Sequence, residues 1–247
     1  MKPKQINSRR IFIYIAGIMA IALFRPVYSG NNPDYRQEFG SKYSDALKYI
    51  IEQSEWIPYF KDHHIDPAFA VAVVFPEIVR YSVISDKIEI AGLQTLYVQY
   101  GAAYADFSIG RFQMKPTFAH AVEKDYYSFR KKIFKDISCK FDTADTPEAR
   151  IARLKRLSTE EGQMTYLMLF IRIMEYRCKS FNWNSEEDKL RYFSTAYNFG
   201  YQKSKDNIVA DMSRKSFHTG IFFGKYVKKY CYADISCDFL KNFKRIF

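Results

Sequence analysis

One carboxyl group lies at the end of an unusually apolar stretch of the chain. Glu77 follows a run from Val71 to Pro76 that has no polar side chain. Burial in such surroundings disfavours a carboxylate and raises its pKa. A carboxylic acid that stays protonated near neutral pH can act as a general acid on a glycosidic oxygen. The alternative is a surface glutamate on an amphipathic helix. Pro76 predicts a kink beside this group if the stretch is helical.

A second segment, residues 108–117, combines a turn with the start of a helix. Gly110 allows a positive φ or a close approach of backbone. Gln113 carries both a donor and an acceptor, which suits an acetamido or hydroxyl group of a sugar. Pro116 is typical of the first position of a helix. Taken alone, this segment is simply a turn that leads into a helix.

A third segment, residues 194–200, ends a predicted helix with Gly200 in the position that follows the C-cap. Tyr197 and Asn198 are adjacent there, so a phenol and an amide could both face a cleft. The alternative is a helix end that packs on the core.

In this order, the three segments resemble the soluble lytic transglycosylase family, which is related to goose-type lysozyme. The family has Glu-Ser, then Gly-Leu-Met-Gln-x-x-Pro-x-Thr, then Ala-Tyr-Asn-Ala-Gly. Gly110, Gln113 and Pro116 match the second motif. The sequence Ala-Tyr-Asn-x-Gly at 196–200 matches the third motif. The resemblance covers residues 66–201.

The sequence also departs from the family pattern. Ile78 follows Glu77 where the family has serine, and Arg111 and Phe112 replace leucine and methionine. Phe199 replaces alanine in the third motif. These differences bear on the choice of substrate and on whether the domain is active.

The resemblance implies an enzyme that cleaves the bond between N-acetylmuramic acid and N-acetylglucosamine in peptidoglycan. It makes Glu77 the single catalytic residue, first as acid and then as base, and it implies no cofactor. The residues that it places at the substrate are Ser108, Gly110, Gln113, Tyr197 and Asn198.

Two other functions stay open. Asp106 lies four residues before Gly110, in about the region where goose-type lysozymes carry an acid. With Asp106 as a second carboxylate across a water from Glu77, the protein would be a hydrolytic lysozyme or a chitosanase-like glycosidase. Asp106 could instead cap a helix or a turn. The other alternative, from a different class, is a non-catalytic glycan-binding or assembly domain on the same fold.

Helices must hold these residues, because helix start signals are frequent and strand-like alternation is scarce. Proline or acidic residues after a capping side chain predict helices that begin near residues 67, 147, 160 and 186. A shorter helix is expected from residue 116, and residues 86–100 favour a helix. Residues 101–108 are expected to form a loop. The predicted fold is mainly α, a lysozyme-like helical domain with at most a small β element.

The amino end has the pattern of a secretory signal peptide. The first ten residues hold four basic side chains, and an uncharged apolar run continues from Ile11 to Phe24. Small residues at Val27 and Ser29 suit cleavage after Ser29. We therefore expect a signal peptide at 1–29, a short polar lead at 30–40 and the domain at 41–247. An uncleaved membrane anchor is the alternative to this export to the periplasm or the cell exterior.

Composition limits the partners of the chain. Of 247 residues 48% are hydrophobic, so global disorder is excluded, and a mean hydropathy of −0.32 excludes a polytopic membrane protein. The net charge of +11 falls to +6 without the five basic residues of 1–29. This charge favours an anionic polymer, for which peptidoglycan glycan strands fit an exported protein, with cell-envelope proteins as further partners. No nucleic acid and no membrane span after signal cleavage are expected.

The four cysteines lie in the predicted mature chain. In an oxidising compartment Cys139, Cys178, Cys231 and Cys237 could form two disulfides, with three pairings open. Buried free thiols are the alternative. No metal site is expected, because the cysteine spacing lacks a Cys-x-x-Cys pair and the adjacent histidines at 63 and 64 cannot both face one ion well.

Overall fold

The computed structural model describes residues 33–53, 55–81, 87–219 and 228–247, and the predicted signal peptide lies outside them. The described residues form a mainly α-helical domain with one two-stranded antiparallel sheet, as the sequence predicted. The helices are α2 (Tyr35–Phe39), α3 (Ser41–Glu52), α4 (Trp56–Asp62), α5 (Pro67–Tyr81), α6 (Lys87–Tyr100), α7 (Pro116–Ile133), α8 (Pro147–Leu157), α9 (Glu160–Arg177), α10 (Glu186–Phe199), α11 (Lys205–Asp211) and α12 (Tyr232–Phe243). The strands are β1 (Lys215–Phe217) and β2 (Tyr230–Cys231), and a 3-10 turn follows at Lys244–Ile246.

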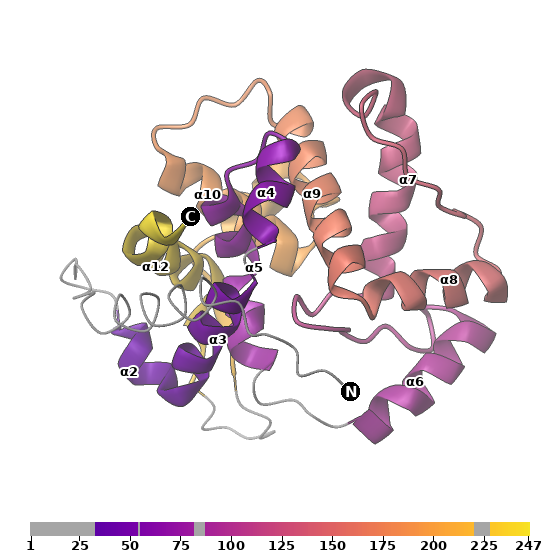
Figure 1. Cartoon of the computed structure of the whole chain (residues 1–247), viewed down its shortest axis with the longest axis horizontal. Coiled ribbons are helices and arrows are strands. Elements are labelled where there is room, and N and C mark those ends of the chain that lie inside the picture. Colours follow the sequence, from indigo (N-terminus) through magenta and orange to yellow (C-terminus); the bar gives the residue numbers. More distant parts are fainter. Residues whose placement is uncertain (1–32, 54, 82–86, 220–227) are drawn as a thin grey trace, which may run out of the picture.

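Helix α5 is the central element of the domain (Figure 1). Every residue from Pro67 to Val79 is buried, because the helix is apolar all round and α3, α4, α9, α10 and α12 surround it. Glu77 is the one ionisable side chain within this buried stretch. The fold therefore places the carboxyl group singled out in the sequence inside its most apolar helix.

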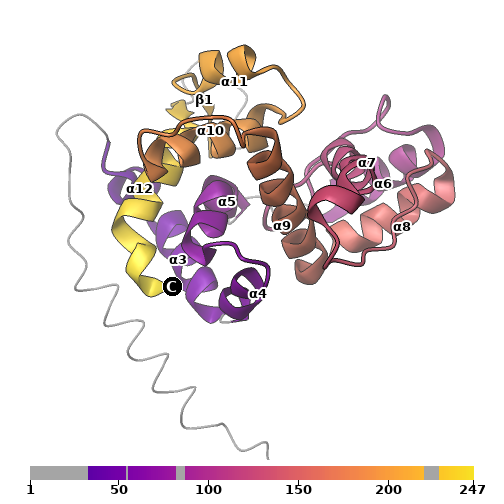
Figure 2. The same ribbon diagram turned by 90° about the horizontal axis from the view of Figure 1, so that it is seen from above.

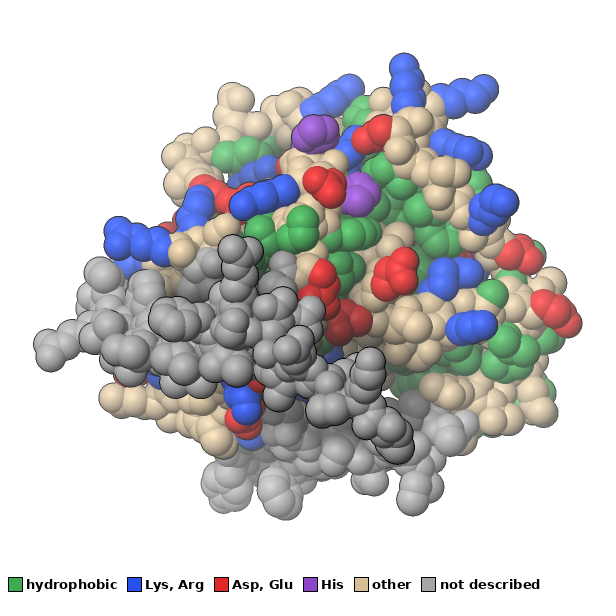
Figure 3. Space-filling view, viewed as in Figure 1, with side chains coloured by type: hydrophobic (Ala, Val, Ile, Leu, Met, Phe, Trp, Pro, Cys, Tyr) green, Lys and Arg blue, Asp and Glu red, His purple; other side chains and the backbone are tan. Residues whose placement is uncertain are grey.

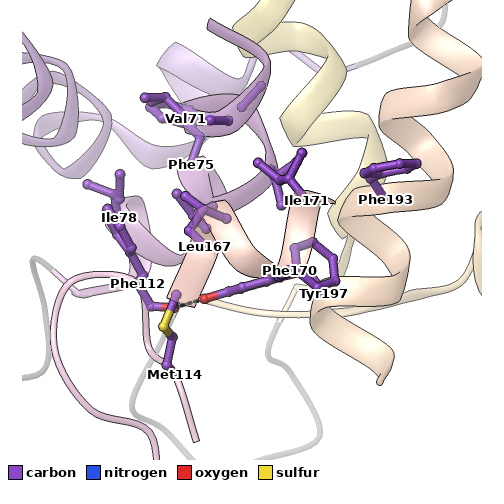
Figure 4. Close-up of a cluster of buried hydrophobic side chains, with 14 of the residues drawn as sticks. Val71, Phe75, Ile78, Phe112, Met114, Leu167, Phe170, Ile171, Phe193 and Tyr197 are labelled. Atoms are coloured by element: carbon purple, nitrogen blue, oxygen red, sulfur yellow. Dashed lines mark hydrogen bonds between the residues drawn. The ribbon is translucent and has the colours of Figure 1, made fainter. Parts of the chain in front are cut away.

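The helices gather in two groups, with α9 between them (Figure 2). One group holds α6, α7 and α8, in which α8 packs on both α6 and α7, and α7 and α8 also contact α9. The other group holds α3, α4, α5, α10 and α12. Figure 4 shows Leu167, Phe170 and Ile171 of α9 among buried side chains of this second group, and the ring of Phe170 packs against that of Tyr197 on α10.

The predicted helix starts are confirmed by their caps. The side chains of Thr146, Thr159 and Ser185 accept backbone N–H groups at the first turns of α8, α9 and α10. Helix α7 begins at Pro116 as expected, but at 18 residues it is not the short helix that the sequence suggested. Buried side chains on later turns, such as Tyr126, keep it in contact with the core.

The sequence predicted a short polar lead at residues 30–40, but residues 35–39 of this segment form helix α2. Tyr35 and Phe39 are 2% and 6% exposed, and both rings contact the ring of Tyr230. The two aromatic side chains lie one helical turn apart, so one face of this short helix can join the core. The partner residue is nearly two hundred positions away, which local sequence does not reveal.

No disulfide is formed in the structure, so the expected pairing of cysteines is not met. All four are free thiols, of which Cys178, Cys231 and Cys237 are buried. Cys231 Sγ donates to the carbonyl oxygen of Met212 at 3.1 Å, and Cys237 Sγ lies 3.9 Å from that of Glu187. The two neighbours in sequence thus contact different elements. In the part of the chain that the structure describes, no helix is both long enough and apolar enough to span a membrane.

Candidate functional site

A cleft of about 660 Å³ lies where α5 and α10 end and α7 begins. Glu77, Gln113 and Tyr197 all line it, so the three motifs meet at one place although 120 positions separate the first from the last. The remaining expected site residues that line this cleft are Asp106, Ser108 and Asn198. Asn198 is exposed at the end of α10.

Glu77 is 4% exposed and lies on the wall of the cleft. Burial raises the pKa of its carboxyl group to about 7, while the positive charges of Arg80 and Lys115 act in the opposite direction. Arg80 Nη2 is 2.7 Å from Oε2 of Glu77, which makes an ion pair. Apart from this ion pair, Oε2 has no hydrogen-bond partner among the described residues. The charge of Arg80 offsets part of the cost of burying the oxygen, and a ligand or water in the cleft could add a hydrogen bond.

The turn at residues 109–114 presents Gln113 to the cleft. Ile109 and Met114 form a two-way backbone bridge, with N–H···O distances of 3.0 and 3.1 Å. Gln113 has a φ of 50°, a rare conformation for a residue other than glycine. Its side-chain Nε2 donates to the carbonyl oxygen of Gly110 at 2.9 Å. One of the two amide hydrogens is therefore engaged within the turn, and the other hydrogen and the side-chain carbonyl are left for a ligand.

Tyr197 supports this turn from the end of α10. Its hydroxyl donates to the carbonyl oxygen of Phe112 at 2.6 Å, the contact drawn as a dashed line in Figure 4. The ring packs edge to face against Phe118 and Phe170. The sequence suggested a phenol that faces the substrate, but this hydroxyl proton is committed to the backbone. Tyr197 thus fixes the position of the residue next to Gln113.

Gly110 does not line the cleft, contrary to the sequence prediction. It has a φ of 70°, and a Cβ added there would lie 1.8 Å from Nε2 of Gln163. Gln163 is 4% exposed, accepts from the N–H of Phe112 at 2.8 Å and donates to the carbonyl oxygen of Leu157 at 2.8 Å. Gly110 is needed for close packing of the turn on α9, so its role is to position the turn. Sequence reasoning missed Gln163 because no local signal marks it.

Asp106 caps helix α7. Its carboxylate accepts the backbone N–H of Thr117 at 3.2 Å and the hydroxyl of Thr117 at 2.8–2.9 Å. Lys115 Nζ is 3.7 Å from Oδ2. The capping alternative for Asp106 therefore describes its main contacts, although the residue also lines the cleft.

Positive side chains add to the cleft. Arg80, Lys115 and Lys203 line it, against the two carboxyl groups of Glu77 and Asp106. The sequence could have predicted the pairing of Arg80 with Glu77, since residues three apart on a helix lie on the same face. On the face shown in Figure 3, lysine and arginine side chains are scattered over the edges and the face itself rather than gathered in one patch. Among the described residues no cluster of His, Cys, Asp and Glu could hold a metal ion.

Comparison with known proteins yields no match to a family model, to a curated protein or to a solved structure.

Proposed function

We propose that this protein cleaves peptidoglycan glycan strands as a lytic transglycosylase with a lysozyme-like helical fold, using Glu77 as its only catalytic residue. The observation that carries the proposal is the state of Glu77. It is a buried carboxyl group on the wall of a cleft, with a pKa raised to about 7 and the guanidinium of Arg80 beside it. A general acid works best when its pKa is near the operating pH.

In the first step the protonated carboxyl group of Glu77 donates its proton to the oxygen between N-acetylmuramic acid and N-acetylglucosamine. The C1–O bond breaks, and the acetamido group of the muramic acid stabilises the positive charge at C1. The Glu77 carboxylate then takes the proton of the 6-hydroxyl group, while O6 bonds to C1 and closes a 1,6-anhydro ring. The proton returns to Glu77, so the cycle needs neither water nor a cofactor.

The surrounding residues support this sequence of steps. Arg80 lies against the carboxylate and would stabilise it after the first proton transfer. The side-chain carbonyl of Gln113 faces the same cleft and can accept a hydrogen bond from an acetamido N–H. Peptide-bearing glycan strands are anionic, which suits the excess of positive side chains in the cleft.

Hydrolysis is a second candidate, because Asp106 lines the same cleft as Glu77. An inverting hydrolase needs a carboxylate that is free to activate a water on the far side of the sugar. The carboxylate of Asp106 instead accepts from Thr117 and lies near Lys115. These contacts favour a single-carboxylate mechanism.

Mass spectrometry of peptidoglycan digests tests the proposal. The wild type, Glu77→Gln and a control with an exposed carboxyl group changed, Glu148→Gln, are incubated with purified peptidoglycan. Fragments that end in 1,6-anhydromuramic acid are expected from the wild type and the control. Glu77→Gln should lose at least about 100-fold in rate, the size of a general-acid contribution.

Other products would change the conclusion. Fragments one water heavier would establish hydrolysis, and Asp106→Asn would then be expected to abolish it. No fragments from folded wild-type protein would overturn the catalytic proposal and favour a glycan-binding or assembly domain.

A further inference from the structure

Two tyrosines form an exposed aromatic pair at the end of α6. Tyr100 is 54% and Tyr104 is 70% exposed, and their ring centroids are 5.2 Å apart with the planes tilted by 46°. Leu96, one helical turn before Tyr100, is 42% exposed. Single apolar side chains on a surface are ordinary, but a cluster of aromatic rings marks a binding surface more often.

The backbone that carries this pair is held in place. Arg150 Nη1 donates to the carbonyl oxygen of Val98 at 3.1 Å near the end of α6. Gly101 follows with a φ of 84°, and a Cβ there would lie 2.9 Å from the guanidinium of Arg150. The N–H of Tyr104 then donates to the carbonyl oxygen of Gly101 at 3.1 Å. A platform built on such a fixed turn loses little conformational freedom when a ligand binds.

The pair lies close to the cleft. Tyr104 precedes Asp106 by two residues, and two residues of extended chain span about 7 Å at most. Asp106 lines the cleft and is fixed there by its contacts with Thr117. The aromatic pair is therefore near the wall that α7 and its preceding loop provide.

The exposed area is small. Taking about 200 Å² for each tyrosine side chain, the pair and Leu96 together expose roughly 300 Å². A stable protein–protein interface covers about 800 Å² on each partner. A ligand that covers one or two rings fits this area better than a protein does. Sugars meet that need, because the C–H face of a pyranose carries partial positive charge and the face of an aromatic ring is electron-rich.

We propose that Tyr100 and Tyr104 form a sugar-binding platform outside the cleft, which holds a more distant part of the glycan strand that Glu77 cleaves. The identity of the ligand as a glycan rests on the function proposed above. It predicts that long strands gain affinity from the platform and that a disaccharide, which occupies the cleft alone, does not.

Binding in the inactive Glu77→Gln background tests the platform. The variant with Tyr100→Ala and Tyr104→Ala is compared with Ile151→Ala, which removes a hydrophobic side chain that is 53% exposed elsewhere. The probes are a disaccharide and a long glycan strand of alternating N-acetylglucosamine and N-acetylmuramic acid, followed by calorimetry. Loss of the platform should weaken long-strand binding about tenfold, the effect of roughly 1.4 kcal/mol of stacking. The disaccharide should bind unchanged, and Ile151→Ala should alter neither affinity.

Unchanged long-strand affinity, or an equal loss for both probes, would overturn the platform. Its failure and that of catalysis are distinguishable. A wild type that binds long strands through the tyrosines but releases no fragment would retain the platform and lose the catalytic proposal. If the wild type cleaves strands but Tyr100→Ala and Tyr104→Ala leave long-strand affinity unchanged, the catalytic proposal is retained and the platform is lost.

Discussion

Glu77 experiences two opposing influences in the folded protein. Burial raises the pKa of its carboxyl group, and the charges of Arg80 and Lys115 lower it without cancelling the effect. Arg80 is itself held over the ring of Phe217, 5.3 Å from its centroid. Because the carboxyl group lies in a core helix, its pKa is near neutral pH instead of near the usual value for glutamate.

This position has a consequence for stability. At low pH, Glu77 is protonated in both the folded and the unfolded chain. As the pH rises past about 4.5, the unfolded chain releases this proton first, so the free energy of unfolding falls until the folded-state pKa of about 7 is passed. The loss amounts to about 3 kcal/mol. Glu77→Gln removes this titration, so the variant should be more stable than the wild type at neutral pH.

Urea unfolding between about pH 4 and pH 8 measures this difference. Asp238, whose pKa burial raises to about 6, titrates in the same window but is present in both proteins. The difference between the two curves therefore isolates Glu77. Parallel curves would show that the pKa of Glu77 is not raised.

The turn at 109–114 packs against helix α9 through the contact between Gly110 and Gln163. Gly110→Ala should destabilise the protein for two reasons: a positive φ and a clash of Cβ with Gln163. Only the second depends on the glutamine, whose amide must give up bonds to Phe112 and Leu157 when it moves. In a Gln163→Ala background the cost of Gly110→Ala should therefore be smaller by about 1–3 kcal/mol.

Urea unfolding of the two single variants and the double variant closes this cycle. Equal costs of Gly110→Ala in both backgrounds would show that the close approach to Gln163 has no energetic weight. The backbone strain would then account for the whole effect.

The elements differ in how far the sequence predicts them. Helices α8, α9 and α10 were predictable because their start signals, such as Thr146 before Pro147, act within one turn. Helix α2 was not, since its burial depends on Tyr230. The site divides in the same way. The sequence marked Glu77 through its apolar neighbours, but nothing local tells that Gly110 faces Gln163 rather than the cleft.

No disulfide joins the described residues, so non-covalent packing alone stabilises the domain. Burial raises the pKa of the Cys178 thiol to about 11, and the other three thiols are also shifted upward by burial. Thiols rather than thiolates then prevail, and these react slowly with oxidants. A reducing agent should leave the Tm unchanged, and all four cysteines should be alkylated after denaturation without reduction. Fewer than four alkylated cysteines by mass spectrometry, or a lower Tm in reductant, would contradict the free-thiol state.

The division of the helices around α9 has a mechanical consequence. Helices α7 and α8 contact α9, while Glu77 is carried by α5 in the other group. A small rotation of α6, α7 and α8 about α9 as a hinge would displace the wall formed by Asp106 and Thr117 and shift Phe118 against Tyr197 of α10, while α5 keeps its contacts with α3 and α12. The acid would then stay rigid while the opposite wall moves, so a bulky polymer could enter and leave sideways without unfolding the core that sets the acidity of Glu77.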